Sequence, residues 1–200
     1  MTRQPRLVAI LAFDEMEVLD FAGPYEVFTV AGSVTSPRAF EVTTVGLTRE
    51  PVAGRGGFTV IPDHDLDSLG DVDILVVPGG AGTRPLMQDE RLIAWLRERA
   101  AATPLTLSVC TGALLLATAG LVDGLPATTH HGAIGELAAA SPTTVIEAGR
   151  RFVRSSDRIR TSGGVSAGID LALAVVEELA GDDVRDDVVE EMEWLWGEEA

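Results

Sequence analysis

Short apolar runs alternate with helix-length segments along this chain, and no other feature of the sequence constrains its fold as much. The clearest runs are Leu7–Phe13, Phe40–Leu47, Asp73–Val77 and Leu105–Val109. The first is apolar at every position, as expected of a strand whose two faces are both covered. Strands that alternate with helices in this way form a mostly parallel central sheet with helices on both faces. We therefore predict an α/β fold.

The segments between the runs carry helix signals. Asp20–Ala31 is predicted as a short helix with Pro24 in its first turn, where proline is tolerated. Asp89 is the predicted N-cap of a helix that ends near Ala101. The other predicted helices are Gly112–Ala119, Gly132–Ala140, Ser166–Ala180 and Asp183–Trp196. The last of these places Val184, Val188, Met192 and Leu195 on one apolar face.

Shorter strands are predicted outside these runs. The glycine-rich segment Val52–Ile61 is predicted as a hairpin, and Ala127–Thr129 as a short strand. A small antiparallel set is predicted from Val145–Ile146, Phe152–Arg154 and Ile159–Thr161. Since no repeat or linker interrupts the pattern, we predict a single domain over residues 1–200.

The charge balance and the cysteine count exclude several functions. The net charge of −16 disfavours nucleic acid and anionic membranes as partners, because like charges repel. One cysteine cannot form an internal disulfide or a cysteine-rich metal site. Leu105–Val122 is uncharged, but turn residues bound it and S-V-C-T-G lies near its start, so it is predicted as a strand and a helix instead of a membrane span. No signal-peptide cleavage motif follows the first apolar run, and the cytoplasm is the expected location.

That single cysteine, Cys110, lies where the strand Leu105–Val109 runs directly into a helix. The pattern resembles a nucleophile elbow, in which a sharp turn presents the nucleophile above the sheet edge. Unpaired N–H groups at a helix start favour an anion, so we predict an exposed thiolate. The N–H of Thr111 is a predicted donor to developing negative charge. On the local pattern alone, a buried and inert cysteine is the alternative.

Two further strand ends supply candidate groups. Gly79 and Gly80 follow the run Asp73–Val77, and their N–H groups are predicted to point into a crevice at the sheet edge. Asp20 follows the first strand, and beside a thiolate its carboxyl would have a raised pKa and could donate a proton. A simple N-cap is the alternative role for Asp20, and Glu17 is the competing proton donor.

A pair of histidines follows the short strand Ala127–Thr129. Adjacent residues of a strand point to opposite faces, so His130 and His131 are not expected to bind one metal, and no metal site is predicted. His130 is the better candidate for a cysteine–histidine dyad. A histidine that only lines the crevice is the alternative.

Taken together, the motifs resemble the ThiJ/PfpI family of the class I glutamine amidotransferase-like superfamily. The resemblance rests on Pro78–Gly80, Ser108–Ala113, Ala127–His130 and Ser162–Leu173, with Leu19–Pro24 similar to the isocyanide hydratase branch. The same module also occurs in some AraC-type regulators. The resemblance implies a flavodoxin-like three-layer sandwich that is usually a homodimer, and it implies no cofactor.

The resemblance also implies an activity on a small electrophilic substrate. Cys110 would attack the isocyanide carbon, Asp20 would supply a proton, Thr111 would orient groups in the pocket, and water would release an N-substituted formamide. The groups expected to line the substrate or oxyanion site are Gly79, Gly80, Glu17 and His130. Thr111 replaces the histidine of the protease-like members, and His131 replaces an aromatic residue of the hydratase. The alternatives are a glyoxalase-like enzyme on 2-oxoaldehydes with Glu17 as base, and a non-catalytic module that binds a ligand or senses oxidation.

Overall fold

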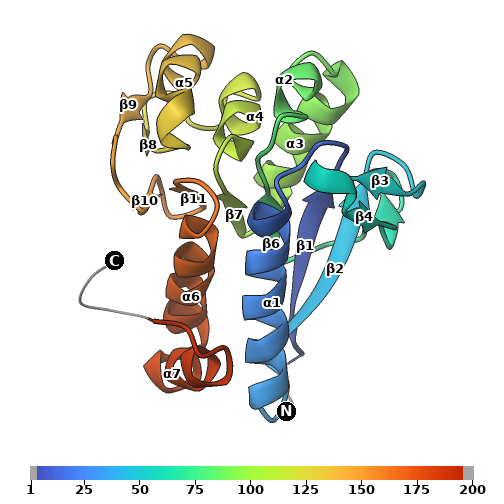
Figure 1. The fold of residues 1–200 in the computed structure, drawn as a ribbon, viewed down its shortest axis with the longest axis vertical. Helices are drawn as coiled ribbons and strands as arrows, with labels where there is room; N and C mark the ends of the chain where they lie inside the picture. Colours follow the sequence, from blue (N-terminus) through green and yellow to red (C-terminus); the bar gives the residue numbers. More distant parts are fainter. Residues whose placement is uncertain (1–3, 196–200) are drawn as a thin grey trace.

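The central sheet is mostly parallel, as predicted. The structure is a computed structural model that describes residues 4–195. The strands of the sheet are β1 (Arg6–Ala12), β2 (Phe40–Gly46), β5 (His64–Asp65), β6 (Ile74–Val77), β7 (Leu105–Ser108), β10 (Phe152–Arg154) and β11 (Ile159–Ser162). They lie in the order β10-β11-β7-β6-β1-β2-β5, and only the pair β10–β11 is antiparallel. Because the other strands run the same way, their carboxyl ends share one edge of the sheet (Figure 1).

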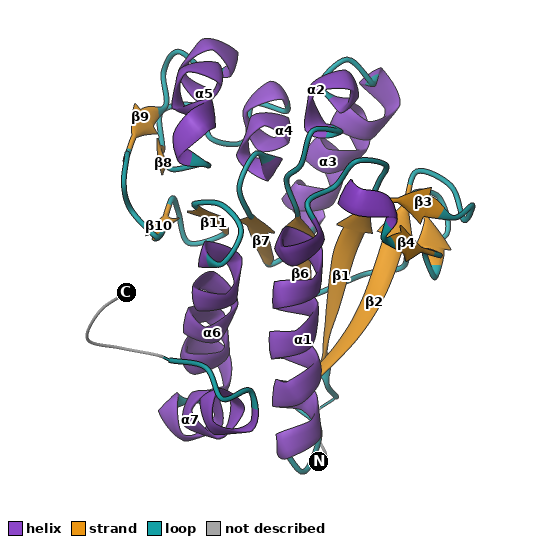
Figure 2. Cartoon of the chain, in the orientation of Figure 1, coloured by secondary structure: helices purple, strands orange, loops and turns teal. Residues whose placement is uncertain are grey.

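Helices cover both faces of this sheet (Figure 2). One layer consists of α1 (Val18–Val34), α6 (Ala167–Ala180) and α7 (Asp182–Glu191), which contact one another. In the other layer α4 (Gly112–Thr118) contacts α2 (Thr83–Leu86), α3 (Glu90–Ala102) and α5 (Ile134–Ala140). The predicted cap of α3 is confirmed, because the Asp89 side chain accepts a hydrogen bond from the N–H of Leu92. The architecture is the predicted three-layer sandwich.

Two small sheets lie outside the central one. The predicted hairpin is confirmed as β3 (Val52–Ala53) and β4 (Thr59–Val60), joined by the single turn η1 (Arg55–Gly57). The predicted antiparallel pairing of Phe152–Arg154 with Ile159–Thr161 is confirmed as β10 and β11, but the inclusion of Val145–Ile146 in that set is wrong. Instead, β9 (Val145–Ile146) pairs in parallel with β8 (Pro126–Ala127), and β11 joins the central sheet beside β7.

The first and last helices of the layer that contains α1 differ from their predicted bounds. Helix α1 begins at Val18, two residues earlier than predicted, so Asp20 lies inside its first turn and Pro24 lies in the second turn instead of the first. In the last helix Val188 is buried as predicted, but the helix ends at Glu191 and Leu195 is 94% exposed. Met192 is the C-cap, and the next residue, Glu193, has a positive φ of 49° that the helix cannot continue through, so Leu195 no longer shares the apolar face. Its predicted end, Trp196, lies outside the described residues.

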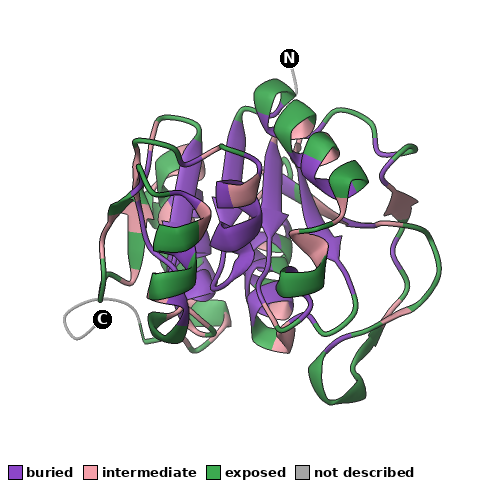
Figure 3. Cartoon of the chain, turned by 90° about the horizontal axis from the view of Figure 1, so that it is seen from above, coloured by how far each residue is buried: buried purple, intermediate pink, exposed green. Residues whose placement is uncertain are grey.

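The hydrophobic core lies on both faces of the central strands, whose residues are buried in the middle of the molecule (Figure 3). Every residue of β6 is buried, which explains the unbroken apolar run in the sequence. The buried helix α4 packs on β6 and β7 from one side. Within residues 4–195, no helix is both long and apolar enough to cross a membrane.

A buried hydroxyl on β7 leads to a first testable prediction. Thr106 is 1% exposed, and its Oγ1 has no hydrogen-bond partner among the described residues. Thr106→Val replaces this unsatisfied group with a methyl of similar size, and we expect the free energy of unfolding to rise by about 1 kcal/mol. Urea denaturation would measure the change. Thr129→Val is the matched control, because the Thr129 hydroxyl donates to the Cys110 carbonyl at 2.7 Å and its loss should destabilise. A Thr106→Val variant as unstable as the control would contradict the prediction.

Candidate active site

Four loops meet at the carboxyl edge of the sheet, where adjacent strands β11, β7, β6 and β1 end. Three of them carry predicted site residues: Glu17 and Asp20 after β1, Gly79 and Gly80 after β6, and Cys110 and Thr111 after β7. The fourth, Gly163–Val165 after β11, was not among the predicted site residues. The parallel topology therefore gathers residues that are far apart in the chain, and such strand-end crevices commonly bind ligands.

Cys110 occupies a sharp turn with a strained backbone. Its φ of 55° lies in the left-handed region that side chains other than glycine rarely adopt. Neighbouring segments hold it there: its N–H donates to the carbonyls of Ser162 (3.2 Å) and Gly163 (3.0 Å), and its own carbonyl accepts from Thr129. The predicted elbow is therefore present, with Cys110 between β7 and α4.

The cysteine is buried, which corrects the prediction of an exposed thiolate. Its residue exposure is 6%. The loop after β11 covers it, since a Cβ placed on Gly164 would lie 3.2 Å from the Cys110 sulfur. The local sequence around Cys110 contains no sign of this cover.

Asp20 lies directly against the sulfur. It is fully buried, and its carboxyl forms a hydrogen bond with the Cys110 thiol. The carboxylate oxygens are fixed by two backbone N–H donors, Gly79 to Oδ2 at 3.1 Å and Val165 to Oδ1 at 2.9 Å. Only glycine fits at position 79, because a Cβ there would lie 2.8 Å from Oδ2. The N-cap alternative for Asp20 is wrong: Glu17 is the N-cap residue of α1.

The surroundings of Asp20 and Cys110 raise both pKa values and so favour the protonated form of each group. Burial raises the pKa of Asp20 to about 7, although its hydrogen bonds to Cys110, Val165 and Gly79 oppose the shift. Burial, and then the negative charge of Asp20, raise the pKa of the Cys110 thiol to about 12. The raised pKa of Asp20 is as predicted. The predicted resting thiolate is wrong, because burial and the carboxylate outweigh the N–H of Thr111 that donates to the sulfur.

The glycine amides serve a different purpose from the predicted one. The Gly79 N–H holds Asp20, and the Gly80 N–H donates to the Thr111 hydroxyl at 2.9 Å. The Thr111 hydroxyl in turn donates to the Gly80 carbonyl at 3.1 Å. These amides anchor the side chains around the sulfur and are not free donors in the crevice.

Charged and aromatic side chains surround this centre. Glu17 accepts a hydrogen bond from Arg55 Nη1 at 2.7 Å, and its negative charge contributes to the raised pKa of Asp20. His130 lies beside Gly164: a Cβ there would be 2.3 Å from its Cδ2. Partial burial, followed by the charges of His131 and Arg84, lowers the pKa of His130.

The two histidines do not point to opposite faces. Their ring centroids are 4.1 Å apart, because His131 begins the single turn η2 (His131–Ala133) and the strand ends before it. The N–H of Gly132 donates to His130 Nδ1 at 3.1 Å. Within the described part of the chain, no three His, Cys, Asp or Glu side chains come close enough to hold a metal ion.

Sequence reasoning missed Arg84. It lies on α2, donates from Nη1 to the Gly80 carbonyl at 3.1 Å, and pairs with Glu136 on α5. Its charge also interacts with Cys110. No motif marks either residue of the ion pair, because α2 is a single short helix and the two residues are distant in the chain.

The glycine above the sulfur provides a second prediction. Gly164→Ala would place a methyl against both Cys110 and the His130 ring, so we expect carbamidomethylation of Cys110 by iodoacetamide to slow by at least about 10-fold. Gly163→Ala is the matched control, since a Cβ there meets its nearest atoms at 3.6 Å, an ordinary contact. Mass spectrometry of the intact protein measures both rates. Equal rates for the two variants would show that Gly164 does not limit access.

A buried cysteine at a strained strand-to-helix turn, paired with a carboxyl from the neighbouring strand end, defines the class of site. The family model described as "DJ-1/PfpI family" matches residues 6–178. The chain belongs to the DJ-1/PfpI family, which confirms the resemblance drawn from the sequence motifs.

Individual relatives differ in their described activities. The isonitrile hydratase of Pseudomonas putida is 35% identical over 94% of this chain and 78% of its own length. The glutathione-independent glyoxalase DJR-1.2 of Caenorhabditis elegans is 27% identical over 76% of this chain and 80% of its own. The crystal structure of a ThiJ/PfpI family protein from Pseudomonas syringae superposes with a TM-score of 0.86 at 27% identity, covering 98% of this chain and 78% of that one.

Proposed function

We propose that the protein is a hydratase that converts a small isocyanide and water into an N-substituted formamide, with Cys110 as nucleophile and Asp20 as proton carrier. The observation that carries the proposal is the buried hydrogen bond between the Asp20 carboxyl and the Cys110 thiol. A carboxyl with a pKa of about 7 both accepts and donates protons near neutral pH, as general acid–base catalysis requires. The similarity to isonitrile hydratase supports the same substrate class.

The proposed first step forms a carbon–sulfur bond. As the Cys110 sulfur attacks the terminal isocyanide carbon, Asp20 accepts the thiol proton and delivers it to that carbon, which gives a thioimidate. The Thr111 N–H, which already donates to the sulfur, stabilises negative charge that develops there. Because the thiol is neutral at rest, Asp20 must act as the base in this step.

The second step consumes water. Water adds to the thioimidate carbon, and one of its protons passes to the nitrogen. The carbon–sulfur bond then breaks, the remaining proton returns to the Cys110–Asp20 pair, and the formamide leaves. The net reaction adds one water to one isocyanide and needs no oxidant, reductant or cofactor.

The proposal is tested with purified protein and an aryl isocyanide in ¹⁸O-water. We expect formamide whose carbonyl carries the heavy oxygen, at a rate whose kcat/KM rises as pH increases through about 7, where Asp20 becomes able to accept the thiol proton. Absence of formamide from a panel of aryl and alkyl isocyanides would reject the proposal.

A glyoxalase-like reaction with Glu17 as base is the second candidate. Its support is the glyoxalase relative and the charge interaction of Glu17 with Asp20 and His130 at the site. Methylglyoxal consumption that survives Asp20→Asn but not Glu17→Gln would favour it. Arg55 holds the Glu17 carboxylate by an ion pair, which makes the isocyanide reaction the better supported of the two.

Oxidation sensing is less well supported. Redox-sensing cysteines are accessible and have low pKa values, whereas Cys110 is buried and its pKa is raised. The proposed thiol chemistry requires a reducing compartment, so the proposal places the enzyme in the cytoplasm.

We also propose that the enzyme is a homodimer that acts on its small substrate alone. The support is the set of exposed apolar side chains on α1, in the β3–β4 hairpin and directly after it, namely Leu19, Tyr25, Phe58 and Ile61. Sedimentation equilibrium would measure the mass, and a monomer at micromolar concentration would reject this part of the proposal.

A further inference from the structure

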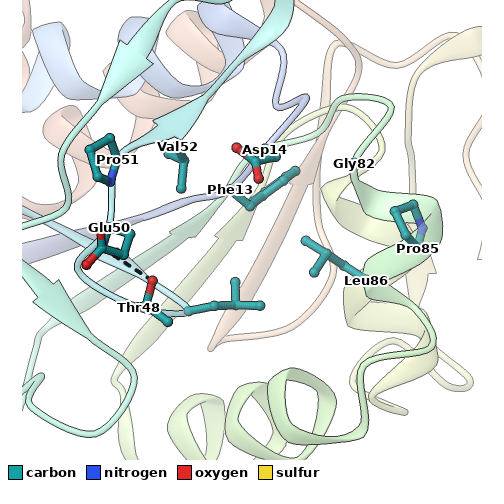
Figure 4. Close-up of a pocket in the computed structure, with 10 residues that line it drawn as sticks. Phe13, Asp14, Thr48, Glu50, Pro51, Val52, Gly82, Pro85 and Leu86 are labelled. Carbon is teal, nitrogen blue, oxygen red and sulfur yellow. Dashed lines mark hydrogen bonds between the residues drawn. The ribbon is translucent and has the colours of Figure 1, made fainter.

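A cavity opens at the sheet edge, away from Cys110. Its volume is about 340 Å³, and it lies where β1 and β2 end. Cys110 follows β7, which is separated from β1 by β6, and none of the candidate catalytic residues lines this cavity. Figure 4 shows its lining residues, which come from the loop after β1, the segment between β2 and the first residue of β3, and helix α2 with the glycine before it. The cavity is therefore a separate potential binding site.

Most of the lining is apolar. The apolar side chains are Phe13, Leu47, Pro51, Val52, Pro85 and Leu86. The polar side chains are Asp14, Thr48 and Glu50. A cavity of this size with an apolar wall and a few polar groups is typical of a small-molecule site.

Asp14 places a carboxylate beside the cavity. Its Oδ1 accepts a hydrogen bond from the Ala53 N–H at 2.8 Å, which fixes the carboxylate beside the cavity. Within residues 4–195, no donor contacts its Oδ2. This second oxygen is therefore available to a ligand, and the nearby Glu50 adds negative charge.

Three arginines near this cavity each interact with an acidic residue outside it. The charge of Arg49, between Thr48 and Glu50 in the chain, acts on Asp65. Arg91 reaches the Leu47 carbonyl at 3.4 Å, but its ion pair is with Asp67. Arg84, next to Pro85 in α2, directs its guanidinium to Glu136. The protein as a whole carries a net charge of −16, which attracts cations and repels anions.

We propose that this cavity binds a small primary ammonium with an apolar body. The ammonium donates to Asp14 Oδ2, and the hydrocarbon packs against Phe13, Leu86 and the other apolar side chains. A neutral alcohol of the same length loses the charge interaction, and a carboxylate is repelled. The proposal does not depend on the reaction catalysed at Cys110.

Calorimetric titration at pH 7.5 tests the proposal with the intact protein. We expect hexylammonium to bind with a Kd of about 1 mM or tighter, and hexan-1-ol and hexanoate to bind at least about fivefold more weakly. Asp14→Asn removes the charge but keeps an oxygen for the Ala53 N–H, and it should weaken hexylammonium binding by about fivefold or more. Leu86→Trp, which fills the cavity, should also weaken it. Glu26→Gln removes an exposed carboxylate of α1 that does not line the cavity, and it should leave the Kd unchanged.

Three outcomes would overturn the proposal. The first is no heat of binding for hexylammonium up to 20-fold above the expected Kd. The second is binding of hexan-1-ol as tight as that of hexylammonium, which would remove the role of the charge. The third is an unchanged Kd in both Asp14→Asn and Leu86→Trp, with far-ultraviolet circular dichroism showing that both variants are folded, because the ammonium would then bind elsewhere on the acidic surface.

Discussion

Cys110→Ala is expected to lower formamide production from an aryl isocyanide by at least about 10⁴-fold, because the covalent route through the thioimidate disappears. Alanine is smaller than cysteine and tolerates the same backbone, so the fold should persist, which thermal unfolding can verify. Steady-state kinetics with product detection by liquid chromatography would measure the loss. Mass spectrometry of the wild-type protein should also show a transient adduct with the mass of the isocyanide, absent from the variant.

Thr106→Val is the appropriate control for this experiment. It changes a buried side chain on β7, the strand that precedes Cys110, without touching the site, so its kcat/KM should match that of the wild type. If Cys110→Ala retains more than about a tenth of the wild-type kcat/KM, the sulfur is not the nucleophile, since removal of a nucleophile costs orders of magnitude. Asp20 would then have to activate water directly.

Much of the fold follows from local patterns in the sequence. Leu7–Phe13 and Asp73–Val77 are uninterrupted apolar runs because both faces of β1 and β6 are covered, and that signal needs no knowledge of distant contacts. The parallel arrangement of these strands then brings Asp20, Gly79 and Cys110 to one edge of the sheet. The composition of the site could therefore be predicted before its geometry was known.

The shortest strands could not be predicted in this way. β8 and β9 contain two residues each, too few for a period of two to be visible, and their partners are chosen by tertiary packing. The same limit applies to β5, a two-residue edge strand that the sequence analysis did not predict.

The ionisation state of Cys110 was predicted wrongly for a related reason. The helix start that favours an anion is visible in the sequence, but the cover by Gly164 comes from a loop more than fifty residues away. The Cys110 N–H also donates to two backbone carbonyls, those of Ser162 and Gly163. Burial and the Asp20 carboxyl therefore decide the pKa of the thiol, and both are products of the tertiary fold.

Asp20→Asn is expected to remove part of the pH dependence of the free energy of unfolding. In the unfolded chain the pKa of Asp20 has its ordinary value of 3.8, whereas in the folded protein burial raises it to about 7. Between these values the folded state retains a proton that the unfolded state has lost, so the wild-type free energy of unfolding falls as pH rises. Three pKa units correspond to about 4 kcal/mol. The variant has no such titration, so its stability relative to the wild type should increase by about this amount between pH 4 and pH 8.

At pH 4 the wild type should have a higher free energy of unfolding than Asp20→Asn. Asparagine offers one oxygen to the two N–H donors of Gly79 and Val165, so the variant loses about 1 to 2 kcal/mol at every pH. Urea denaturation at a series of pH values separates this constant loss from the pH-dependent gain. The same substitution should lower kcat/KM for the isocyanide by about 10² or more, because it removes the proton carrier.

Asp63→Asn is the matched control for the titration. Although burial opposes the shift, hydrogen bonds from Thr44 and Thr43 hold the pKa of Asp63 below its usual value. Its contribution to stability is therefore lost only as pH falls below about 4, and the difference between this variant and the wild type should stay constant from pH 4 to pH 8. If Asp20→Asn shows the same flat difference, Asp20 ionises in the folded protein as it does in the unfolded chain. A carboxyl of that kind would hold too few protons near neutral pH to carry one from the thiol to the substrate.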